Sequence, residues 1–475
     1  MKFNFPVSQK LSFVDVQHLR LRAGFGTPLK DAIREKGGQR KAIVDALFDD
    51  SKAYQPITLF DKDSWRKDVM KDLPPERRKE LRKEMRLHMK LLNLEWLEKM
   101  SFAKGQLREK MTFFWHDHFA AEVRRPYAMQ DFNNVMRKHA LGDFKTLLKQ
   151  VSKHPVMLLY LNARQNRKAS PNENFAREVM ELFTLGTGQY TEKDIKEAAR
   201  AFTGWNFTPD GKFIVRKGQH DNGNKTFRGK TGNFDGDDIL DMILADRQTA
   251  VFICEKLYCY LVHPEPEAEK VQEMANVFYD SGYQISKVLR FVFESDWFYA
   301  PKNQGVRIKS PTEYLAVMVR SMGLKFAEPE KLVQVQKLLG QVLFLPPNVA
   351  GWPDGTAWID SSTLSLRMML PAVLLLGEEA RMAAKSDLMD MDEDMKAPRK
   401  LRKVQATADW NGLEKVLAKV KDEDLTDLLA WRIFQVPPNQ INLDFLHQRV
   451  DKSSRRRHLQ TLLVQAMTLP EYQLI

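Results

Sequence analysis

The sequence has little cysteine and no long apolar run. Only two cysteines occur, Cys254 and Cys259. Five residues apart on a helix, their side chains point about 140° apart, which suits neither a local disulfide nor a shared metal. We expect two buried thiols in a reducing compartment. No segment reaches the roughly 20 apolar residues of a spanning helix, and residues 1–10 lack the apolar core of a secretory signal. These absences predict a soluble, cytoplasmic protein without a membrane span.

Motifs for nucleic acids and nucleotides are also missing. The net charge of +12 could attract nucleic acid, anionic lipid or an acidic protein. However, no finger spacing, aromatic RNA-binding signature or basic zipper accompanies this charge. Residues 220–226 lack the glycine spacing of a phosphate-binding P-loop. We interpret most of the basic excess, which lies in short runs such as 77–79 and 455–457, as solvated helix faces.

The composition is that of a folded, mainly α protein. Apolar residues make up 43% and aromatic residues 10% of the chain, enough for a buried core. The periodicity predicts one large multi-helix domain with two long irregular loops, 206–238 and 345–362, and at most a small β-hairpin near 212–215. We divide the chain into a main helical domain (1–384, with a charged helical hairpin insertion at 62–100), a charged linker or insertion (385–408), and C-terminal helices (409–475) packing on the main domain.

Three helix starts carry the pattern of a capping box, in which a hydroxyl side chain and an acidic side chain bond each other's backbone N–H groups. The patterns begin at Ser170, Thr191 and Ser310. Ser170 and Ser310 are each followed by proline, which suits the first helical position. We therefore predict helices that begin directly after these three residues.

His116 and His118 are the first candidates for chemistry, with Asp117 between them. Two residues apart on a straight helix, they would point about 200° apart and could not share an ion. They converge only if the helix ends or bends near Trp115, or if the segment is extended. In the alternative interpretation, one histidine is a hydrogen-bonded core residue within an aromatic cluster.

The segment after Ser170 carries four charges on one helix face, at Glu173, Arg177, Glu178 and Glu181. As a structural device, Glu173 caps the helix and Arg177 pairs with Glu173 and Glu181 at four-residue spacing. As a functional device, the face turns inward, where Glu173, Glu178 or Glu181 can bind a metal and Arg177 an anionic group. Periodicity alone leaves both interpretations open.

Two loops supply the remaining candidates. His220 and Asp221 would add nitrogen and oxygen ligands suited to zinc, manganese or iron, and the neighbouring Lys225 could hold negative charge. Tryptophans in loops suit stacking on a sugar or another flat ligand, although many plug a core instead. The candidates for substrate binding are Trp205, Trp352, Trp358 and Asn348.

These motifs, taken in order, resemble the large bacterial family catalogued as domain of unknown function number eighteen hundred. They are residues 22–26 (RAGFG), 113–119 (FFWHDHF), 172–186, 190–192 (YTE), 199–205 (ARAFTGW), the 220–225 loop, 309–313 (KSPTE), 346–353 (PPNVAGWP) and 470–474 (PEYQL). The resemblance implies that the candidate residues in these motifs are more than a solvated face. It also implies a protein partner similar to an alkaline phosphatase or sulfatase, since relatives are often encoded beside one. Many relatives are exported.

We weigh three functions. The first is a metal-dependent hydrolase acting on an anionic ester or glycan-like small molecule, with metal-activated water, Glu178 or Glu181 as ligand or general base, and Arg177 or Lys225 holding negative charge. The second is an oxidoreductase that uses iron or copper at the same ligands. The third is a non-catalytic helical partner of the phosphatase-like protein, whose motifs serve as ion pairs and caps.

Overall fold

A computed structural model describes residues 10–28, 31, 35, 37–61, 73–377, 380, 381, 400, 401, 404, 406–436, 441, 446 and 450–475. These residues form a mainly helical protein, as predicted. The helices are α1 (Phe13–Arg22), α3 (Arg40–Asp50), α4 (Pro75–Phe102), α5 (Gln106–His118), α6 (Pro126–His139), α7 (Phe144–Ser152), α8 (Pro155–Tyr160), α9 (Asn174–Glu181), α10 (Glu192–Ala201), α11 (Gly236–Leu244), α12 (Arg247–Leu261), α13 (Ala268–Asp280), α14 (Ile285–Glu294), α15 (Pro311–Met322), α16 (Lys331–Leu339), α17 (Ser361–Leu376), α18 (Trp410–Leu417), α19 (Leu425–Ile433) and α21 (Arg455–Met467).

The strands are short and pair only in twos. The antiparallel pairs are β1 (Trp205–Phe207) with β2 (Phe213–Val215), β3 (Lys225–Phe227) with β4 (Lys230–Gly232), β5 (Lys325–Phe326) with β8 (Ala406–Thr407), and β6 (Ala380–Arg381) with β7 (Lys400–Leu401). The 3-10 turns are η2 (Ala163–Gln165), η3 (Lys217–Gln219), η4 (Asp296–Tyr299), η5 (Pro301–Asn303), η6 (Gly355–Trp358) and η10 (Pro470–Gln473). The loop predicted at 206–238 thus holds a second hairpin beyond the one expected.

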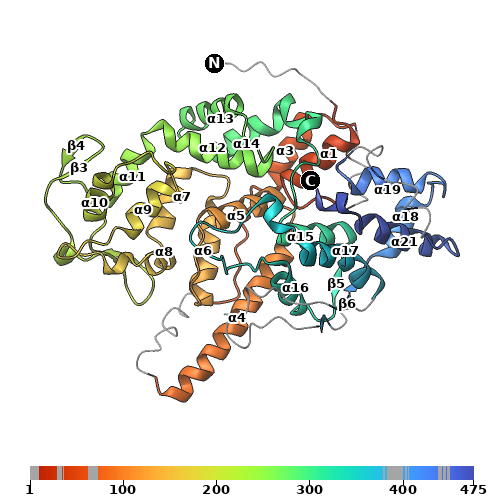
Figure 1. The fold of residues 1–475 in the computed structure, drawn as a ribbon, viewed down its shortest axis with the longest axis horizontal. Coiled ribbons are helices and arrows are strands. Elements are labelled where there is room, and N and C mark those ends of the chain that lie inside the picture. The colour runs from red at the N-terminus through yellow and green to blue at the C-terminus, as the bar shows by residue number, and fades with distance from the viewer. Residues whose placement is uncertain are drawn as a thin grey trace.

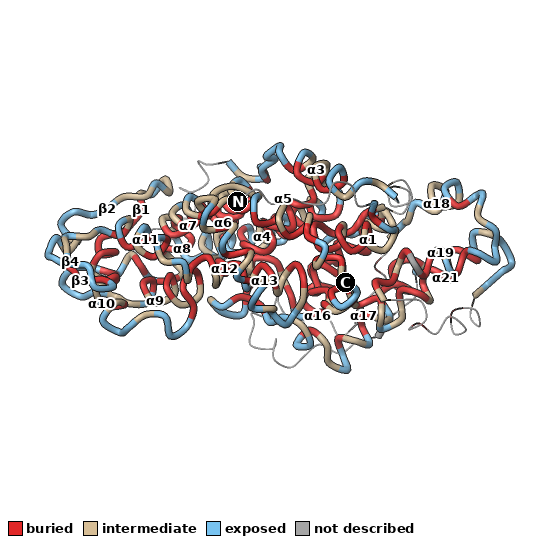
Figure 2. The backbone as a smooth tube through the Cα atoms, turned by 90° about the horizontal axis from the view of Figure 1, so that it is seen from above, coloured by how far each residue is buried: buried red, intermediate tan, exposed pale blue. Residues whose placement is uncertain are grey.

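The molecule is elongated, with α5 near its middle (Figure 1). Helices α8 to α11 and the first two hairpins lie at one end, and α18, α19 and α21 lie at the other. Buried backbone runs through the whole length rather than through one end alone (Figure 2). The C-terminal helices contact the rest of the chain through α1 and α17. The predicted linker at 385–408 falls mostly outside the described residues. No helix among the described residues is long and apolar enough to cross a membrane.

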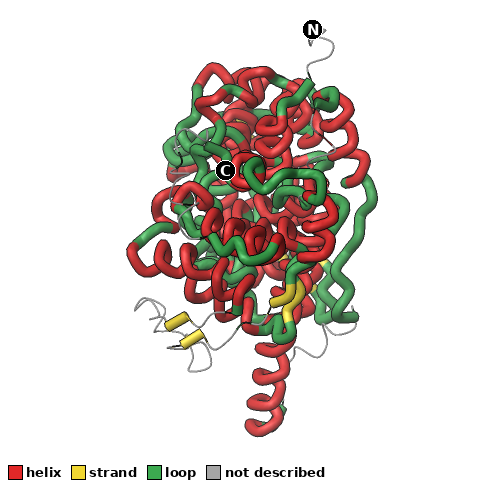
Figure 3. Tube along the Cα trace, turned by 90° about the vertical axis from the view of Figure 1, so that its right-hand side faces the viewer, coloured by secondary structure: helices red, strands yellow, loops and turns green. Residues whose placement is uncertain are grey.

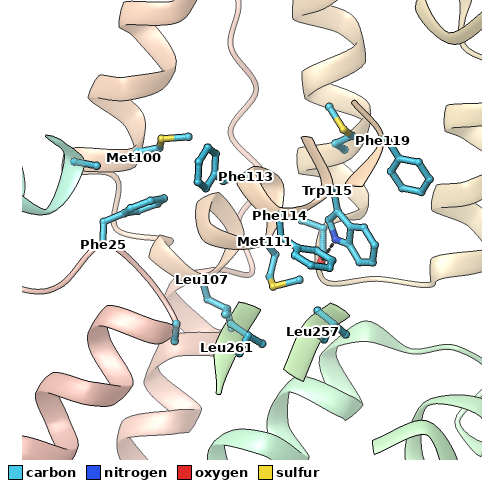
Figure 4. Close-up of a cluster of buried hydrophobic side chains, with 14 of the residues drawn as sticks. Phe25, Met100, Leu107, Met111, Phe113, Phe114, Trp115, Phe119, Leu257 and Leu261 are labelled. Carbon is cyan, nitrogen blue, oxygen red and sulfur yellow. Dashed lines mark hydrogen bonds between the residues drawn. The ribbon is translucent and has the colours of Figure 1, made fainter. Parts of the chain in front are cut away.

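Helix α5 forms the centre of the core because its apolar residues recur at helical spacing. Leu107, Met111 and Phe114 are buried on one face, toward Leu257 and Leu261 of α12 (Figure 4). Each such side chain contributes about 1.5–3 kcal/mol on burial. A helix buried to this extent holds its last turn, which carries the two histidines, in a fixed place.

Helix α4 stands out from the body at its N-terminal end (Figure 3). Its buried side chains concentrate toward the C-terminal half, where Leu92, Trp96 and Met100 are fully buried. This half therefore packs against the core, while the charged start at residues 74–77 is exposed. Residues 62–72, the first part of the predicted hairpin insertion, lie outside the described residues.

Two of the three predicted capping boxes are confirmed. The Ser310 and Thr191 side chains each accept from the third helical residue, and that acidic residue accepts from the cap. The Ser170 prediction is wrong, since α9 begins only at Asn174 and Glu173 makes no side-chain cap bond. Instead, the Asn172 side chain accepts from the Asn174 backbone N–H at 3.1 Å. An asparagine two residues before the helix therefore takes the role expected of the serine.

Candidate functional site

His116 and His118 occupy the last turn of α5 and point to different parts of the fold. His116 Nε2 accepts the backbone N–H of Phe344 at 3.1 Å, whereas His118 Nε2 donates to the Phe183 carbonyl at 3.2 Å. Burial lowers the pKa of His116 to about 3 and that of His118 well below its ordinary value, so both rings are neutral at pH 7. The helix stays regular through both residues. The two rings are therefore directed apart, as helical geometry requires.

Asp117, between them, holds the loop that carries residues 346–353. Its Oδ1 accepts the Trp352 backbone N–H at 2.8 Å. Gly351 has a φ of +90°, and a Cβ there would lie 2.4 Å from the same Oδ1. Only glycine can bring the loop this close to the carboxyl group. Burial raises the pKa of Asp117 to about 6.

A buried ion cluster lies at the start of α15. The Lys110 ammonium contacts Glu313 Oε1, and the Arg307 guanidinium contacts Glu313 Oε2 at 3.2 Å. Burial lowers the pKa of Lys110 to about 8. Burial alone would raise the pKa of Glu313, but Arg307 and Lys110 hold it below its ordinary value. Sequence reasoning missed Lys110 and Arg307, since only their three-dimensional position beside the capping residue reveals them.

The charged face of α9 forms ion pairs at the surface rather than a convergent site. Arg177 binds both carboxylate oxygens of Glu192 at 2.9 Å and lies 3.5 Å from Glu173. Glu181 accepts the Tyr190 hydroxyl instead of pairing with Arg177. Glu178 is half-buried, and burial together with Glu181 raises its pKa. Within the described residues, the Glu178 carboxylate neither accepts a hydrogen bond nor forms an ion pair, whereas Glu173 has its ion pair with Arg177.

The His220 loop is fixed by its own candidate residues. His220 Nδ1 lies 2.9 Å from the Thr203 carbonyl oxygen. A carbonyl oxygen can only accept, so Nδ1 donates this hydrogen bond. Asp221 Oδ2 accepts from Arg200 Nε at 2.8 Å. Lys225 is fully buried and donates to the Asp221 carbonyl and to Asn233. These bonds attach the β3–β4 hairpin to α10.

The predicted stacking residues lie mostly in the interior. Trp205, Trp352 and Trp358 are 3%, 8% and 4% exposed, which favours the alternative that they plug the core. Trp205 contacts Phe202 and Phe213 edge-on, which shows that it plugs the core. Asn348 is exposed, and its side chain accepts the Ala350 backbone N–H at 2.8 Å.

The candidate residues therefore gather in two places. The His116–His118 turn meets the 344–352 loop at the centre, while His220 and Asp221 lie by α10 at one end of the molecule (Figure 1). Across the described ranges, no three or more histidine, cysteine, aspartate or glutamate residues form a group that could hold a metal ion. Cys254 and Cys259 are free thiols on α12.

A groove of about 590 Å³ runs between the projecting part of α4 and α16. Its lining combines six cationic side chains with seven apolar ones and Asn93, and contains no carboxylate. The cations are Arg82, Lys83, Arg86, Lys90, Arg124 and Lys337, and the apolar residues are Met85, Leu87, Met89, Val333, Val342, Leu343 and Leu345. At its base, Asn93 and Gln336 exchange two amide hydrogen bonds of 2.9 and 2.7 Å across the helices. In the sequence, one wall of this groove corresponds to the charged 62–100 segment. We had interpreted the basic runs of that segment as a solvated helix face.

The comparisons with known proteins fit this description. Residues 18–474 match the model of one family, whose description is "Protein of unknown function (DUF1800)". Neither a curated protein nor a solved structure matches the chain. The match runs from within α1 to η10 and includes the central loop contacts of Asp117 and the buried cluster of Glu313. The chain therefore belongs to the DUF1800 family.

Proposed function

We propose that the protein is a helical binding module whose α4–α16 groove holds an acidic, partly apolar helix of a partner protein. The lining of the groove carries this proposal. The lining itself holds six cations and no carboxylate, although Arg124 also pairs with Glu122 outside it at 3.0 Å, so the surface is positive. Exposed apolar side chains such as Leu87 offer area to bury. A ligand that complements this lining must itself be both acidic and apolar.

The spacing of the cations favours a helix as the occupant. Arg82, Arg86 and Lys90 stand four residues apart along α4, so they span about 12 Å of helix length. Carboxylates that match them must also be spread along a line. A helix with acidic residues four apart presents that line, whereas a lipid concentrates its charge in one head group.

The apolar part of the groove suits the other face of such a helix. Met85 and Met89 lie one turn apart on α4, and methionine adapts its shape to a ligand. Leu87 is 55% exposed at the rim. On the opposite wall, Val333 and Leu343 are buried. This pattern is typical of grooves that bind an amphipathic helix by its apolar stripe.

The roles of the family motifs also support a binding module. His116, Asp117 and His118 each bond the backbone of a distant segment, and His220 and Asp221 fix a hairpin. Residues used in this way keep the fold. The partner similar to an alkaline phosphatase or sulfatase, implied by the family resemblance, is the first protein to test. The metal-dependent hydrolase and the redox-metal oxidoreductase stay predictions.

Charge reversal in the groove tests the proposal. The probe is a fluorescently labelled amphipathic peptide of glutamate and leucine with acidic residues four apart. The full chain with Arg82→Glu, Arg86→Glu and Lys90→Glu should bind it at least tenfold more weakly than the unchanged protein. A matched variant with Lys193→Glu, Lys230→Glu and Lys287→Glu, all exposed and outside the groove, should keep the affinity within about twofold, since distant charges are screened.

Two outcomes contradict the proposal. Equal loss of affinity in both triple variants would show that only net charge matters. Binding of anionic phospholipid vesicles, with no saturable binding of the peptide, would show that the groove meets a membrane surface instead.

A further inference from the structure

A second cavity lies where α8, η2 and the β1–β2 hairpin meet. Its volume is about 240 Å³. Three arginines line it, Arg164, Arg167 and Arg216, together with three amide side chains and two leucines, and its lining contains no carboxylate. Three guanidinium groups around one small cavity repel each other, so the arrangement needs an explanation.

The three arginines lack the ion pairs that their neighbours have. Within the described part of the chain, Arg164, Arg167 and Arg216 form no ion pair with a carboxylate, whereas Arg177 and Arg200 nearby do. Burial lowers the pKa of Arg164 most, and the positive charges of Arg216 and Arg125 lower it further. The positive charge of this cavity is therefore uncompensated by protein groups.

The contacts that fix Arg164 leave most of its N–H donors available to a ligand. Arg164 Nε donates to Asn206 Oδ1 at 3.1 Å, and its guanidinium lies 4.7 Å from the Phe207 ring centre. This fixes the plane of Arg164 and leaves its two terminal nitrogens without a partner among the described residues.

The backbone around the cavity is equally well fixed. The Lys168 N–H donates to the Gln219 carbonyl at 2.8 Å, and the Arg216 N–H donates to the Gly204 carbonyl at 2.8 Å. The segments that carry Arg167 and Arg216 are thus joined to the rest of this end of the molecule. Asn162, at the mouth, has a φ of 56°, the left-handed conformation that starts the η2 turn. Because the backbone is held in advance, a ligand has only the Arg167 and Arg216 side chains to order, which keeps the ordering cost low.

We infer that this cavity is a binding site for a tetrahedral oxyanion, the phosphate or sulfate group of a small molecule. Guanidinium groups bind such oxygens in pairs of parallel hydrogen bonds, and the amides of Asn162, Gln165 and Asn206 can donate to the remaining ones. The volume is below that of cavities for drug-sized ligands. The bound part is therefore the anionic group with few further atoms. This site is separate from the groove of the proposed function.

Titration calorimetry of the full chain tests the inference. The probes are inorganic phosphate, inorganic sulfate and glucose 6-phosphate, each at constant ionic strength with chloride as the reference anion. We expect saturable binding, and at least tenfold weaker binding in the Arg167→Gln/Arg216→Gln variant. A matched Lys168→Gln/Lys217→Gln variant removes two exposed charges beside the cavity but not in it, and should bind within about twofold of the unchanged protein.

The comparison of probes distinguishes an anionic ester from a free inorganic anion as the ligand. Tighter binding of glucose 6-phosphate than of inorganic phosphate indicates an ester ligand, and equal binding indicates a free anion. Circular dichroism shows whether each variant is folded. Because Arg167 and Arg216 are exposed at the mouth, we expect both to fold. Absence of saturable binding in the millimolar range, or equal loss in both double variants, would overturn the inference.

Discussion

Asp117 and Trp352 are 235 residues apart in the chain, and a 2.8 Å hydrogen bond from the Trp352 backbone to the Asp117 carboxylate joins them. The neighbouring Gly351 makes this contact possible. We predict that Gly351→Ala destabilises the protein by about 3 kcal/mol or more, since it adds a clash to a left-handed conformation. Urea unfolding measures the difference. Gly355→Ala is the matched control, because Gly355 also has a positive φ but no atom within 4 Å of its Cβ position. A similar loss in both variants would show that the clash is unimportant.

Asp117 also predicts a pH dependence. Its pKa is raised from 3.8 to about 6 in the folded protein, so between these values the folded state holds a proton that the unfolded state has lost. The free energy of unfolding should therefore fall as the pH rises from about 4 to about 6. Asp117→Asn keeps an acceptor for the Trp352 N–H and has no charge to bury. We expect this variant to lack that fall in a urea-unfolding series. An unchanged pH profile in the variant would contradict the assignment.

Glu313 should be among the most sensitive positions of the fold. We predict that Glu313→Gln costs about 3–5 kcal/mol, because it leaves Lys110 and Arg307 buried without their counter-ion. Chemical unfolding measures the loss. Glu192→Gln breaks the exposed pair with Arg177 and should change stability little. The prediction fails if the two variants are equally stable.

The helix starts give a third comparison of stability. Thr191→Ala removes a cap bond that the structure contains and should cost about 1 kcal/mol. Ser170→Ala removes a hydroxyl that caps no helix, and thermal unfolding should show a change within about 0.5 kcal/mol. A larger loss of stability in Ser170→Ala would indicate that Ser170 does form the capping box that the sequence pattern predicts.

Metal content distinguishes the remaining functions. If the protein is a binding module, as we propose, elemental analysis of the purified protein should find no stoichiometric zinc, manganese, iron or copper. A stoichiometric metal that disappears in a His116→Ala/His118→Ala variant would favour the hydrolase or the oxidoreductase over the binding module.

Local patterns predicted more of this molecule than long-range contacts did. The caps at Thr191 and Ser310, and the packed end of α4, depend on residues a few positions apart, so the sequence shows them. The role of Asp117 depends on Gly351, and the pairing of Lys110 depends on Glu313. The groove needs both α4 and α16. Such partners meet only through the tertiary fold, and no spacing in the sequence announces them.

The Asn93–Gln336 amide pair gives the groove a direction. It ties α4 to α16 at the base, while the N-terminal end of α4 projects from the body (Figures 1 and 3). A helix lying in the groove can extend past the Arg82 end but must stop at Asn93. Such a site favours the end of a partner chain over a segment from its middle.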